Sequence, residues 1–369
     1  MKKGWTEVAF SEAFSDVTTG QPKTKTGEFL TSGVIPIVDQ GRQLVGGFTN
    51  DATARCTLPL PLIAFGDHTK AIKYIDFDFG VGADGVKLLQ AQEGIDPRYG
   101  YHFLRSARLT DGGYDRHFKY LKRLSVPRPS LDEQRRIAAI LDQADELRAK
   151  RRAAIAHLDS LTEAIFLDMF GDPVSNPMSW PVTSIRDLAE SLTYGSSEKA
   201  LASGRIPVLR MGNLTSTGRI ITGDLKYVDE AKDKHLLEPG DLVFNRTNSA
   251  ELVGKTAVFN ESGTWAYAGY LVRLRLTGSA EPTYVGAFMN LPSTKLKLRS
   301  MCKSIVGMAN INAKELGTIR LPVPPTAAQR AFAQAADAME NERLRAVSAL
   351  THLDTLFASL QARAFAGEL

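Results

Sequence analysis

The sequence predicts a mixed α/β fold, with two globular domains joined by two long antiparallel coiled-coil helices. Three observations predict it. The chain repeats itself at an offset of 195 residues, taking Gln134 to Gln329. Two segments carry a seven-residue apolar rhythm, and short strand-like runs separated by turn residues fill the remainder. The repeat also predicts a pseudo-two-fold relation between the two halves.

The repeat is clearest where Val126–Arg136 aligns with Leu321–Ala331. The same offset pairs further landmarks downstream: Asp142 with Asp337, His157–Asp159 with His352–Asp354, and Phe170 with Phe365. A weaker register with a drifting offset joins the earlier parts: Trp5 with Trp180, Gly33–Val38 with Gly204–Leu209, and Leu62–Thr69 with Leu242–Ser249. Such drift predicts loops of different length on a shared core.

Two long helices follow from capping signals and apolar spacing. Ser130 and Glu133 form a capping box directly after a proline-rich segment. Apolar residues then recur at alternating intervals of three and four, broken only where Arg151 takes one position: Ile137, Ile140, Ala144, Leu147, Ala154, Leu158, Leu161 and Ile165. The second helix begins after Pro325 and has the corresponding residues Phe332, Ala335, Met339, Ala346, Ala349, Leu353, Leu356 and Leu360. Helices of about 38 residues would each be about 57 Å long. The shared landmarks favour an antiparallel coiled coil over two unrelated amphipathic helices, which stay the alternative.

The globular segments predict a twisted sheet in each half. Strand-like runs bounded by turn residues are Val34–Val38, Leu60–Phe65, Gly240–Phe244 and Tyr270–Leu276. Short helices are expected at Tyr99–Ser106 and Pro282–Met289.

Composition excludes several classes of protein. With 369 residues, 43% of them apolar, and a net charge of +4, the chain is an ordinary globular protein and not a disordered or collagen-like one. Two cysteines, Cys56 and Cys302, do not make a disulfide framework. The N-terminus lacks the apolar segment of a signal peptide, and no window approaches 18 uninterrupted apolar residues. We therefore expect a cytoplasmic location.

The motifs of catalytic sites are incomplete. Gly80–Gly85 matches G-x-G-x-x-G, but no long helix follows to present its N-terminus to a dinucleotide. Gly254–Thr256 resembles the end of a phosphate-binding loop, yet Ser249 occupies the place of its first glycine. The histidines and cysteines lack metal-binding spacing. We predict a binding protein with no catalytic residue and no metal site in this chain.

Charge is distributed unevenly. The two helical segments carry net charges of −2 and −1, which leaves +7 on the globular parts, as expected if those parts face phosphates. Their loops offer Arg and Asn, the bidentate partners of guanine and adenine, and Lys for phosphates. Solvated surface loops are the alternative. The residues that we predict to contact DNA are Arg42, His68, Lys70, Lys73, Arg210, Asn213, Asn245, Arg246, Asn248 and Lys255.

The whole chain resembles the specificity subunit of Type I restriction–modification systems. The resemblance is most specific in Val126–Ile137 with the long helix after it, in Gly66–Thr69 and in Gly33–Pro36. It implies target-recognition domains at residues 1–128 and 173–325, and conserved helices at residues 129–172 and 326–369. Each domain would read one half of a split double-stranded DNA sequence.

The same resemblance implies the partners. The helices would space the two domains and dock methyltransferase subunits, two of them in the expected complex, with restriction subunits bound indirectly. Candidate docking residues are Gln134, Arg135, Gln329 and Arg330. Catalysis would belong to the partners, which would bind S-adenosylmethionine, ATP and magnesium, so no cofactor is expected in this chain.

One departure from the family pattern lies at Thr326–Gln329, which lacks the acidic residue before Gln. We expect a weaker docking face there, or a different cap. Phe365–Leu369 matches the end of the first repeat, so the second repeat is expected to be whole.

Two domains related by a two-fold axis would enter major grooves about 34 Å apart and read an asymmetric target. The alternatives are a nuclease or methyltransferase fused to its own recognition domains, and a coiled-coil scaffold that never touches DNA.

Overall fold

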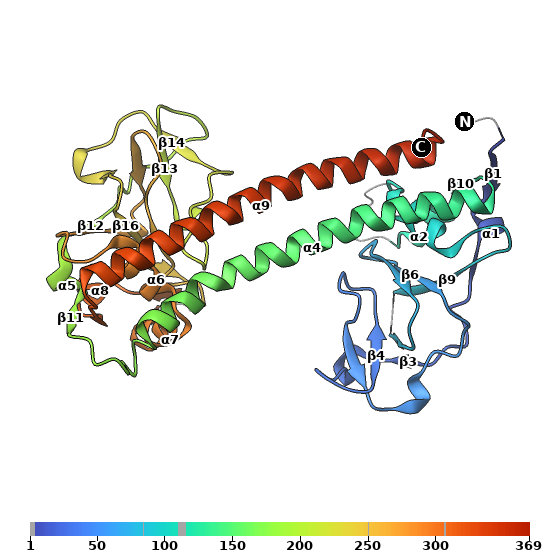
Figure 1. Ribbon diagram of the computed structural model, residues 1–369, viewed down its shortest axis with the longest axis horizontal. Coiled ribbons are helices and arrows are strands. Elements are labelled where there is room, and N and C mark those ends of the chain that lie inside the picture. The colour runs from blue at the N-terminus through green and yellow to red at the C-terminus, as the bar shows by residue number, and fades with distance from the viewer. Residues whose placement is uncertain (1–3, 84, 110–115, 250, 306–307) are drawn as a thin grey trace. The chain divides into compact units, whose positions relative to one another are not determined.

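The computed structural model describes residues 4–83, 85–109, 116–249, 251–305 and 308–369. The chain divides into two compact units (Figure 1). Unit 1 consists of Met1–Arg152 together with Ser348–Leu369, and unit 2 consists of Ala153–Val347. Each unit combines sheets, short helices and one half of each of two long helices, so the predicted mixed α/β fold is confirmed.

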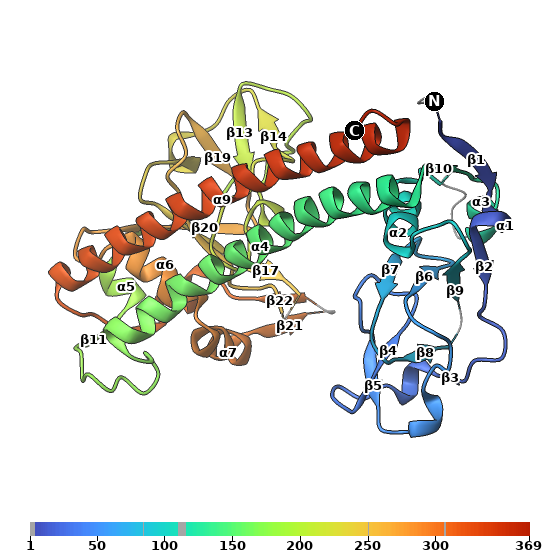
Figure 2. The ribbon, with the colours of Figure 1, turned by 45° about the vertical axis from the view of Figure 1, so that its right-hand side comes forward.

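Unit 1 contains two four-stranded sheets (Figure 2). The first is antiparallel, and its strands in spatial order are β2 (Phe14–Asp16), β9 (Val86–Ala91), β6 (Leu62–Gly66) and β7 (Ile72–Ile75). The second is mixed, in the order β3 (Lys23–Thr24), β8 (Gly80–Gly82), β4 (Ile35–Val38) and β5 (Gly47–Thr49). In addition, β1 (Thr6–Ala9) pairs with β10 (Ser125–Arg128).

Unit 2 repeats this order of strands except at one outer position. Its antiparallel sheet consists of β12 (Ala189–Tyr194), β20 (Leu271–Leu276), β16 (Leu242–Asn245) and β18 (Thr256–Val258). Its mixed sheet consists of β14 (Lys226–Val228), β13 (Ile206–Leu209), β19 (Trp265–Tyr267) and β15 (Leu236–Leu237). The exception is β15, which is antiparallel to its neighbour while β3 is parallel to its own. The pair β11 (Val182–Ser184) and β23 (Arg320–Pro322) corresponds to β1 and β10. The pairs β4–β8 and β13–β19 are both parallel, so the weaker register found in the sequence is confirmed.

The short helices follow the same repeat. Unit 1 has α1 (Phe10–Ala13), α2 (Pro97–Ser106) and α3 (Phe118–Leu121), and unit 2 has α5 (Ile185–Leu188), α6 (Pro282–Asn290) and α8 (Ala313–Gly317) at the same places in the order. Unit 2 adds α7 (Pro292–Met301) and a sheet of β17 (Thr247–Asn248), β22 (Met308–Asn310) and β21 (Lys303–Ile305). Single 3-10 turns are η1 (Thr26–Glu28), η2 (Ala52–Ala54), η3 (Met211–Asn213) and η4 (Asp233–His235). The predicted helices at Tyr99–Ser106 and Pro282–Met289 are confirmed.

The two long helices are α4 (Leu131–Phe170) and α9 (Thr326–Ala366). The first half of α4 packs against the last half of α9 in unit 1, and the second half of α4 packs against the first half of α9 in unit 2. The helices are therefore antiparallel, as predicted. The predicted apolar seam is only partly right, because Leu147, Leu161 and Leu356 are exposed. In unit 1 the neighbouring Phe357 is buried instead, under the guanidinium of Arg148.

A buried glutamine fixes the start of each long helix. The Gln134 Oε1 accepts from the Asp96 N–H at 2.8 Å, and its Nε2 donates to the Gly94 and Pro129 carbonyls, both at 2.9 Å. We call this arrangement, and its counterpart in unit 2, the glutamine clamp. Asp96 is the N-cap of α2, so the clamp ties the first turn of α4 to the first turn of a domain helix.

Unit 2 repeats the clamp. The Gln329 Oε1 accepts from the N–H of Glu281, the N-cap of α6, at 3.0 Å, and its Nε2 donates to the Pro324 carbonyl at 2.7 Å. A tyrosine three residues after each N-cap strengthens the junction. The Tyr99 hydroxyl donates to the Pro127 carbonyl at 2.8 Å, and that of Tyr284 donates to its counterpart Pro322 at 2.7 Å. Burial raises the pKa of both phenols, so both stay protonated donors.

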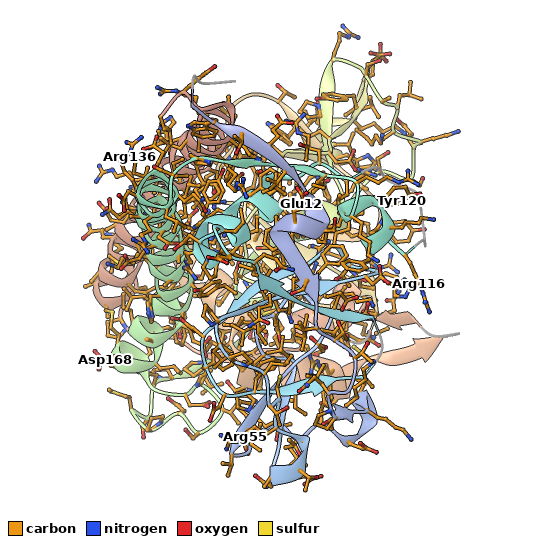
Figure 3. All side chains as sticks on the ribbon, turned by 90° about the vertical axis from the view of Figure 1, so that its right-hand side faces the viewer. Glu12, Arg55, Arg116, Tyr120, Arg136 and Asp168 are labelled. Carbon is orange, nitrogen blue, oxygen red and sulfur yellow. The ribbon has the colours of Figure 1, made fainter. Side chains whose placement is uncertain are left out.

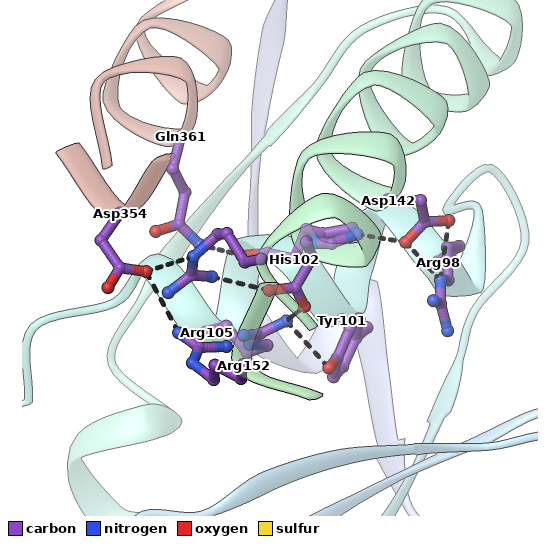
Figure 4. A network of polar contacts seen from close by, with 10 residues as sticks. Arg98, Tyr101, His102, Arg105, Asp142, Arg152, Asp354 and Gln361 are labelled. Carbon is purple, nitrogen blue, oxygen red and sulfur yellow. Dashed lines mark hydrogen bonds and ion pairs between the residues drawn. The ribbon is translucent and has the colours of Figure 1, made fainter. Parts of the chain in front are cut away.

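Charged side chains join α2 to the long helices in unit 1 (Figure 4). Asp142 of α4 accepts from the Arg98 Nε at 2.8 and 2.9 Å, and lies 2.7 Å from the His102 Nε2. One turn further along, Asp145 accepts from Arg105 at 2.6 Å and from Arg148 at 2.6 Å. Arg148 also donates to Asp354 of α9 at 2.6 Å, so the contacts of Asp145 extend from α2 through α4 to α9.

In unit 2 the corresponding junction is aromatic. The ring of Phe166 stacks on Tyr284 at a centroid distance of 5.2 Å, and the Phe170 ring lies 5.0 Å from the same tyrosine. Phe332 of α9 meets both phenylalanines edge-on. Asp337, the repeat partner of Asp142, is exposed and has no ion-pair partner among the residues that the structure describes. Both units combine ring packing with ion pairs. In unit 2, Arg343 pairs with Glu340 at 2.8 Å, as Arg148 does with Asp145 at 2.6 Å in unit 1.

The glutamine clamp predicts a large stability difference between two glutamines of α4. Gln134→Leu would leave one N–H and two carbonyls buried without partners, and we expect the free energy of unfolding of unit 1 to fall by about 3 kcal/mol. Gln143→Leu, at an exposed position of the same helix, should change it little. Denaturant unfolding with hydrogen exchange of the α2 amides measures both. Equal effects of the two substitutions would contradict the role of the clamp.

His102 predicts a loss of stability in acid. Its burial lowers the pKa of the imidazole below 6.5, against the opposing effect of the hydrogen bond that the ring makes to the Asp142 carboxylate. The unfolded chain then binds the proton more tightly than the folded one, so stability should fall as the pH drops below 6.5. We expect His102→Gln to lose less stability between pH 7.5 and 5.5 than the unsubstituted protein, whereas His157→Gln, at an exposed position, should behave like it. The pH dependence of α2 amide exchange measures this, and identical curves for all three proteins would rule it out.

Candidate nucleic-acid interface

In unit 1 the turn after β6 is held against α3 by Asp67. Asp67 is buried. Its backbone carbonyl accepts from the His117 N–H and its side-chain carboxylate accepts from the Phe118 N–H, both at 2.8 Å. On the other side, the Thr69 hydroxyl donates to the Gln40 carbonyl. A Cβ at Gly66 would lie 2.6 Å from that carbonyl oxygen, so only glycine permits the approach. The motif Gly66–Thr69 therefore fixes three segments together: residues 39–46, 66–71 and 116–123, which we call the unit 1 loop surface.

The predicted DNA contacts of unit 1 fall on this surface, with one exception. Arg42 is exposed, and His68 and Lys70 are half-buried on the turn. Lys73 is only 5% exposed, and its Nζ donates to the Asp39 carbonyl at 2.7 Å and pairs with the Asp39 carboxylate at 3.2 Å. Burial lowers the pKa of Lys73 in spite of this ion pair. The prediction that Lys73 contacts a phosphate is therefore wrong: it ties the Arg42 loop to β7.

The segment from Arg116 to Arg123 adds cations that were not among the predicted contacts. Arg116, Lys119, Lys122 and Arg123 are all exposed, and Figure 3 shows Arg116 and Tyr120 at the edge of unit 1. The Lys122 ammonium lies 4.9 Å from the centroid of the Phe118 ring, and Lys119 and Arg123 lie 5.0 and 5.6 Å from that of Tyr120. The signal was present in the sequence as four cations within eight residues, interleaved with aromatic side chains.

In unit 2 the equivalent turn presents Arg246. Its N–H donates to the Tyr270 carbonyl at 3.1 Å, and its carbonyl accepts from the Ile311 N–H at 2.9 Å, so the backbone is fixed on both sides. The guanidinium lies 4.9 Å from the centroid of the Tyr194 ring and has no carboxylate within 4 Å among the described residues. Tyr194 and Tyr270 are 39% and 55% exposed. We call Tyr194, Arg246, Asn248 and Tyr270 the unit 2 loop surface.

Of three predicted base contacts in unit 2, two make hydrogen bonds within the fold and the third is buried. Asn213 is 4% exposed, and its side chain accepts from the Arg210 N–H at 3.0 Å and donates to the Ile221 carbonyl at 3.0 Å. The Arg210 guanidinium donates to the carbonyl and carboxylate of Asp224, at 3.0 and 3.1 Å. Asn245 is fully buried on β16. The predictions for Asn213 and Asn245 are therefore wrong, because neither amide reaches the surface, and the guanidinium of Arg210 is already engaged.

The remaining predicted contacts are partly accessible. Asn248 is half-buried, and its Oδ1 accepts from the Ser249 N–H at 2.9 Å. Lys255 is half-buried directly before β18, with its Nζ donating to the Leu214 carbonyl at 3.0 Å. Neither has a carboxylate partner within the described parts of the chain. Both keep the capacity to bind an external acceptor.

The four candidate docking residues divide into two kinds. Gln134 and Gln329 are fully buried in the glutamine clamp, so their prediction as docking residues is wrong. Arg135 is 64% exposed and pairs with Asp132 at 3.5 Å, whereas Arg330 is 69% exposed and pairs with Glu281 at 2.9 Å. Only the arginines remain available to a partner protein.

In the part of the chain that the structure describes, no three His, Cys, Asp or Glu side chains gather as a metal site would require. The glycine-rich motif Gly80–Gly85 lies in β8 and the turn to β9, a strand and not the helix of a dinucleotide site; its Asp84 is outside the described residues. Within the same residues, none of the helices is both long and apolar enough to span a membrane.

Known proteins resemble this chain in sequence and in fold. Residues 2–157 match the family model described as the Type I restriction modification DNA specificity domain. The EcoKI specificity subunit of Escherichia coli K12 is 27% identical over 276 residues, which cover 67% of this chain and 58% of that protein. The StySPI specificity subunit of Salmonella potsdam is 24% identical over 314 residues, or 76% of this chain and 67% of that protein. The chain thus spans about three fifths of the EcoKI subunit that it matches.

Solved structures share the fold over nearly the whole chain. The S subunit of a Type I restriction–modification system from M. genitalium has a TM-score of 0.62 at 15% identity, covering 98% of this chain and 96% of that one. A chain from a study of Type I complex assembly and conformational transition has a TM-score of 0.57 at 16% identity, covering 100% and 99%. The family match, the curated relatives and the shared fold all make this chain similar to the specificity subunits of Type I restriction–modification systems.

Proposed function

We propose that the chain recognises double-stranded DNA, with each unit reading one half of a bipartite target. The observation that carries this proposal is that the turns after β6 and β16 are both fixed to the start of a short helix, α3 or α8, yet present different side chains. Two rigid but dissimilar surfaces suit a target whose two halves differ in sequence. The spacer between the halves would depend on the long helices.

The charges of the two surfaces support contact with DNA. In unit 1, Lys119, Lys122 and Arg123 are exposed and lie beside the turn that carries His68 and Lys70. Cations that track a phosphate backbone supply affinity, and side chains that reach base edges supply specificity. In unit 2, Arg246 is pre-oriented by the Tyr194 ring and has a guanidinium fork that suits the O6 and N7 of guanine.

Catalysis and its cofactors we assign to partner subunits. Methyl transfer from S-adenosylmethionine and ATP-driven cleavage would then need methyltransferase and restriction subunits, with the long helices as the docking site for the former. The sequence supports this division because it carries no complete catalytic motif. Purified chain incubated with DNA and S-adenosylmethionine should yield no methylated product, and methylation without partners would favour a fused modification enzyme.

The bipartite target is testable by selection from random DNA. The chain, reconstituted with its methyltransferase subunits, should enrich duplexes with two blocks of preferred bases that flank an unselected spacer. A single continuous block, or no enrichment, would contradict recognition by two separate units. Enrichment of two identical blocks would contradict the asymmetry of the two loop surfaces.

Substitution of Arg246 is expected to reduce discrimination between base pairs and to leave the general affinity for DNA unchanged. Arg246→Lys keeps the charge but loses the planar fork, so preference at one base pair should fall by about tenfold to a hundredfold, as for a lost bidentate contact. Arg205→Lys is the matched control in the same unit, because Arg205 is 72% exposed and only 3.9 Å from Glu230. Binding to a panel of single-base variants measures both. An unchanged preference profile in Arg246→Lys would remove this residue from the base contacts.

The exposed arginines at the two helix starts predict a docking defect. Arg135→Glu combined with Arg330→Glu should weaken binding of the methyltransferase subunits at least tenfold, because both side chains extend from the surface beside the clamp. Lys150→Glu, another exposed cation on α4, serves as the control for charge alone. Co-purification and calorimetric titration would measure the change. Equal binding by the double variant and the control would show that docking lies elsewhere.

A further inference from the structure

A cationic cavity of about 370 Å³ lies in unit 2, next to the turn that carries Arg246 and Asn248. Three cations line it: Lys255 directly before β18, and Lys295 and Arg299 on α7. Lys295 and Arg299 are four residues apart and therefore lie on one face of the helix. Ser216 and Asn290 also line the cavity.

The positive charge in this cavity is not neutralised. Glu251 also lines the cavity, but within the described residues none of the three cations has a carboxylate within 4 Å. The Lys295 Nζ donates to the Gly254 carbonyl, and the Lys255 Nζ donates to the Leu214 carbonyl at 3.0 Å. Burial, with repulsion from Lys255 and Arg299, lowers the pKa of Lys295 to about 7. An ammonium desolvated among other cations is stabilised by a bound anion.

The lining suits an anion with several acceptor oxygens. A phosphate can accept from two ammonium groups and from a guanidinium at once, and the Ser216 hydroxyl is a further donor on the wall. The Asn290 amide is already engaged, since its Nδ2 donates to the Thr256 carbonyl at 2.7 Å and to the Gly286 carbonyl at 2.9 Å. It holds the floor of the cavity in place.

We propose that the cavity formed by Lys255, Lys295 and Arg299 binds a phosphate group. Resting on the DNA-recognition function proposed above, the phosphate is a backbone phosphate of the duplex beside the bases that Arg246 and Asn248 face. The position in the chain supports this source, because the Gly254 N–H donates to the Asn245 carbonyl at 2.8 Å and so fixes the cavity rim to the Arg246 turn.

Salt-dependent DNA binding tests the proposal in the reconstituted complex. Lys295→Gln should weaken binding to every sequence alike and reduce the slope of log affinity against log salt by about 0.9, as for one lost phosphate contact. Arg299→Gln, at an exposed rim position, should do the same without risk to the core. Lys297→Gln is the matched control, since Lys297 is exposed two positions along α7 and points away from the Lys295 face. Slopes equal to that of Lys297→Gln in both cavity variants would overturn the proposal.

A second measurement identifies the source of the phosphate. The full chain labelled with ε-13C lysine allows the titration of Lys295 to be followed by NMR, alone, with inorganic phosphate and with target duplex. We expect both additions to raise its pKa, and duplex to displace inorganic phosphate. A rise with inorganic phosphate that duplex does not displace would support a phosphate cavity but exclude the DNA backbone as its source.

The two proposals fail in different ways. No change in the pKa of Lys295 with either addition would overturn the cavity, even if the complex still selects a bipartite DNA target. Failure of the complex to bind any DNA would overturn the proposed function, and the titration with inorganic phosphate would still decide whether the cavity binds phosphate.

Discussion

The buried amides of Gln134 and Gln329 are the constraint on which both halves of the molecule depend. Each amide satisfies backbone groups from two segments at once, the proline-rich stretch before a long helix and the first turn of a domain helix. Such groups are costly to bury unpaired, so the segments cannot separate without losing several hydrogen bonds. These hydrogen bonds fix the start of each long helix against its own domain. Both halves need them, which explains why the sequence around the prolines is repeated.

Much of the fold could be predicted because its signals are local. The prolines, the Ser130 capping box and the apolar rhythm specify helix starts and faces, and the repeat transfers each assignment to the other half. Burial of polar side chains could not be predicted, because it depends on contacts between distant segments. Gln134, Lys73 and Asn245 are as polar as any surface residue, yet all three are buried. Burial of apolar side chains is also mispredicted at Leu356, which is exposed while the neighbouring Phe357 is buried.

The candidate interface combines accessible and engaged cations, and only the structure separates them. Lys73 forms an ion pair with Asp39, whereas Arg246 lies beside an aromatic ring and, among the residues that the structure describes, has no carboxylate next to it. The net charge calculated from the sequence does not distinguish a paired cation such as Lys73 from an accessible one such as Arg246. What remains for a partner is a smaller set, concentrated on segments that buried tethers such as Asp67 hold in place. Rigid presentation reduces the entropy lost on binding, which favours discrimination between similar sequences.

The division of the chain also has a consequence for the order of folding during synthesis. Unit 2 is one continuous stretch, whereas unit 1 is completed by the last 22 residues, Ser348–Leu369. The core of unit 1 includes Phe357, Ala364 and Phe365, with Phe365 packed 5.4 Å from the rings of Tyr99 and Phe103. A nascent chain would therefore expose the apolar residues of unit 1 that α9 later covers, among them Tyr99, Ile137 and Leu141, while unit 2 is being made. Unit 1 can complete its core only after α9 has emerged from the ribosome.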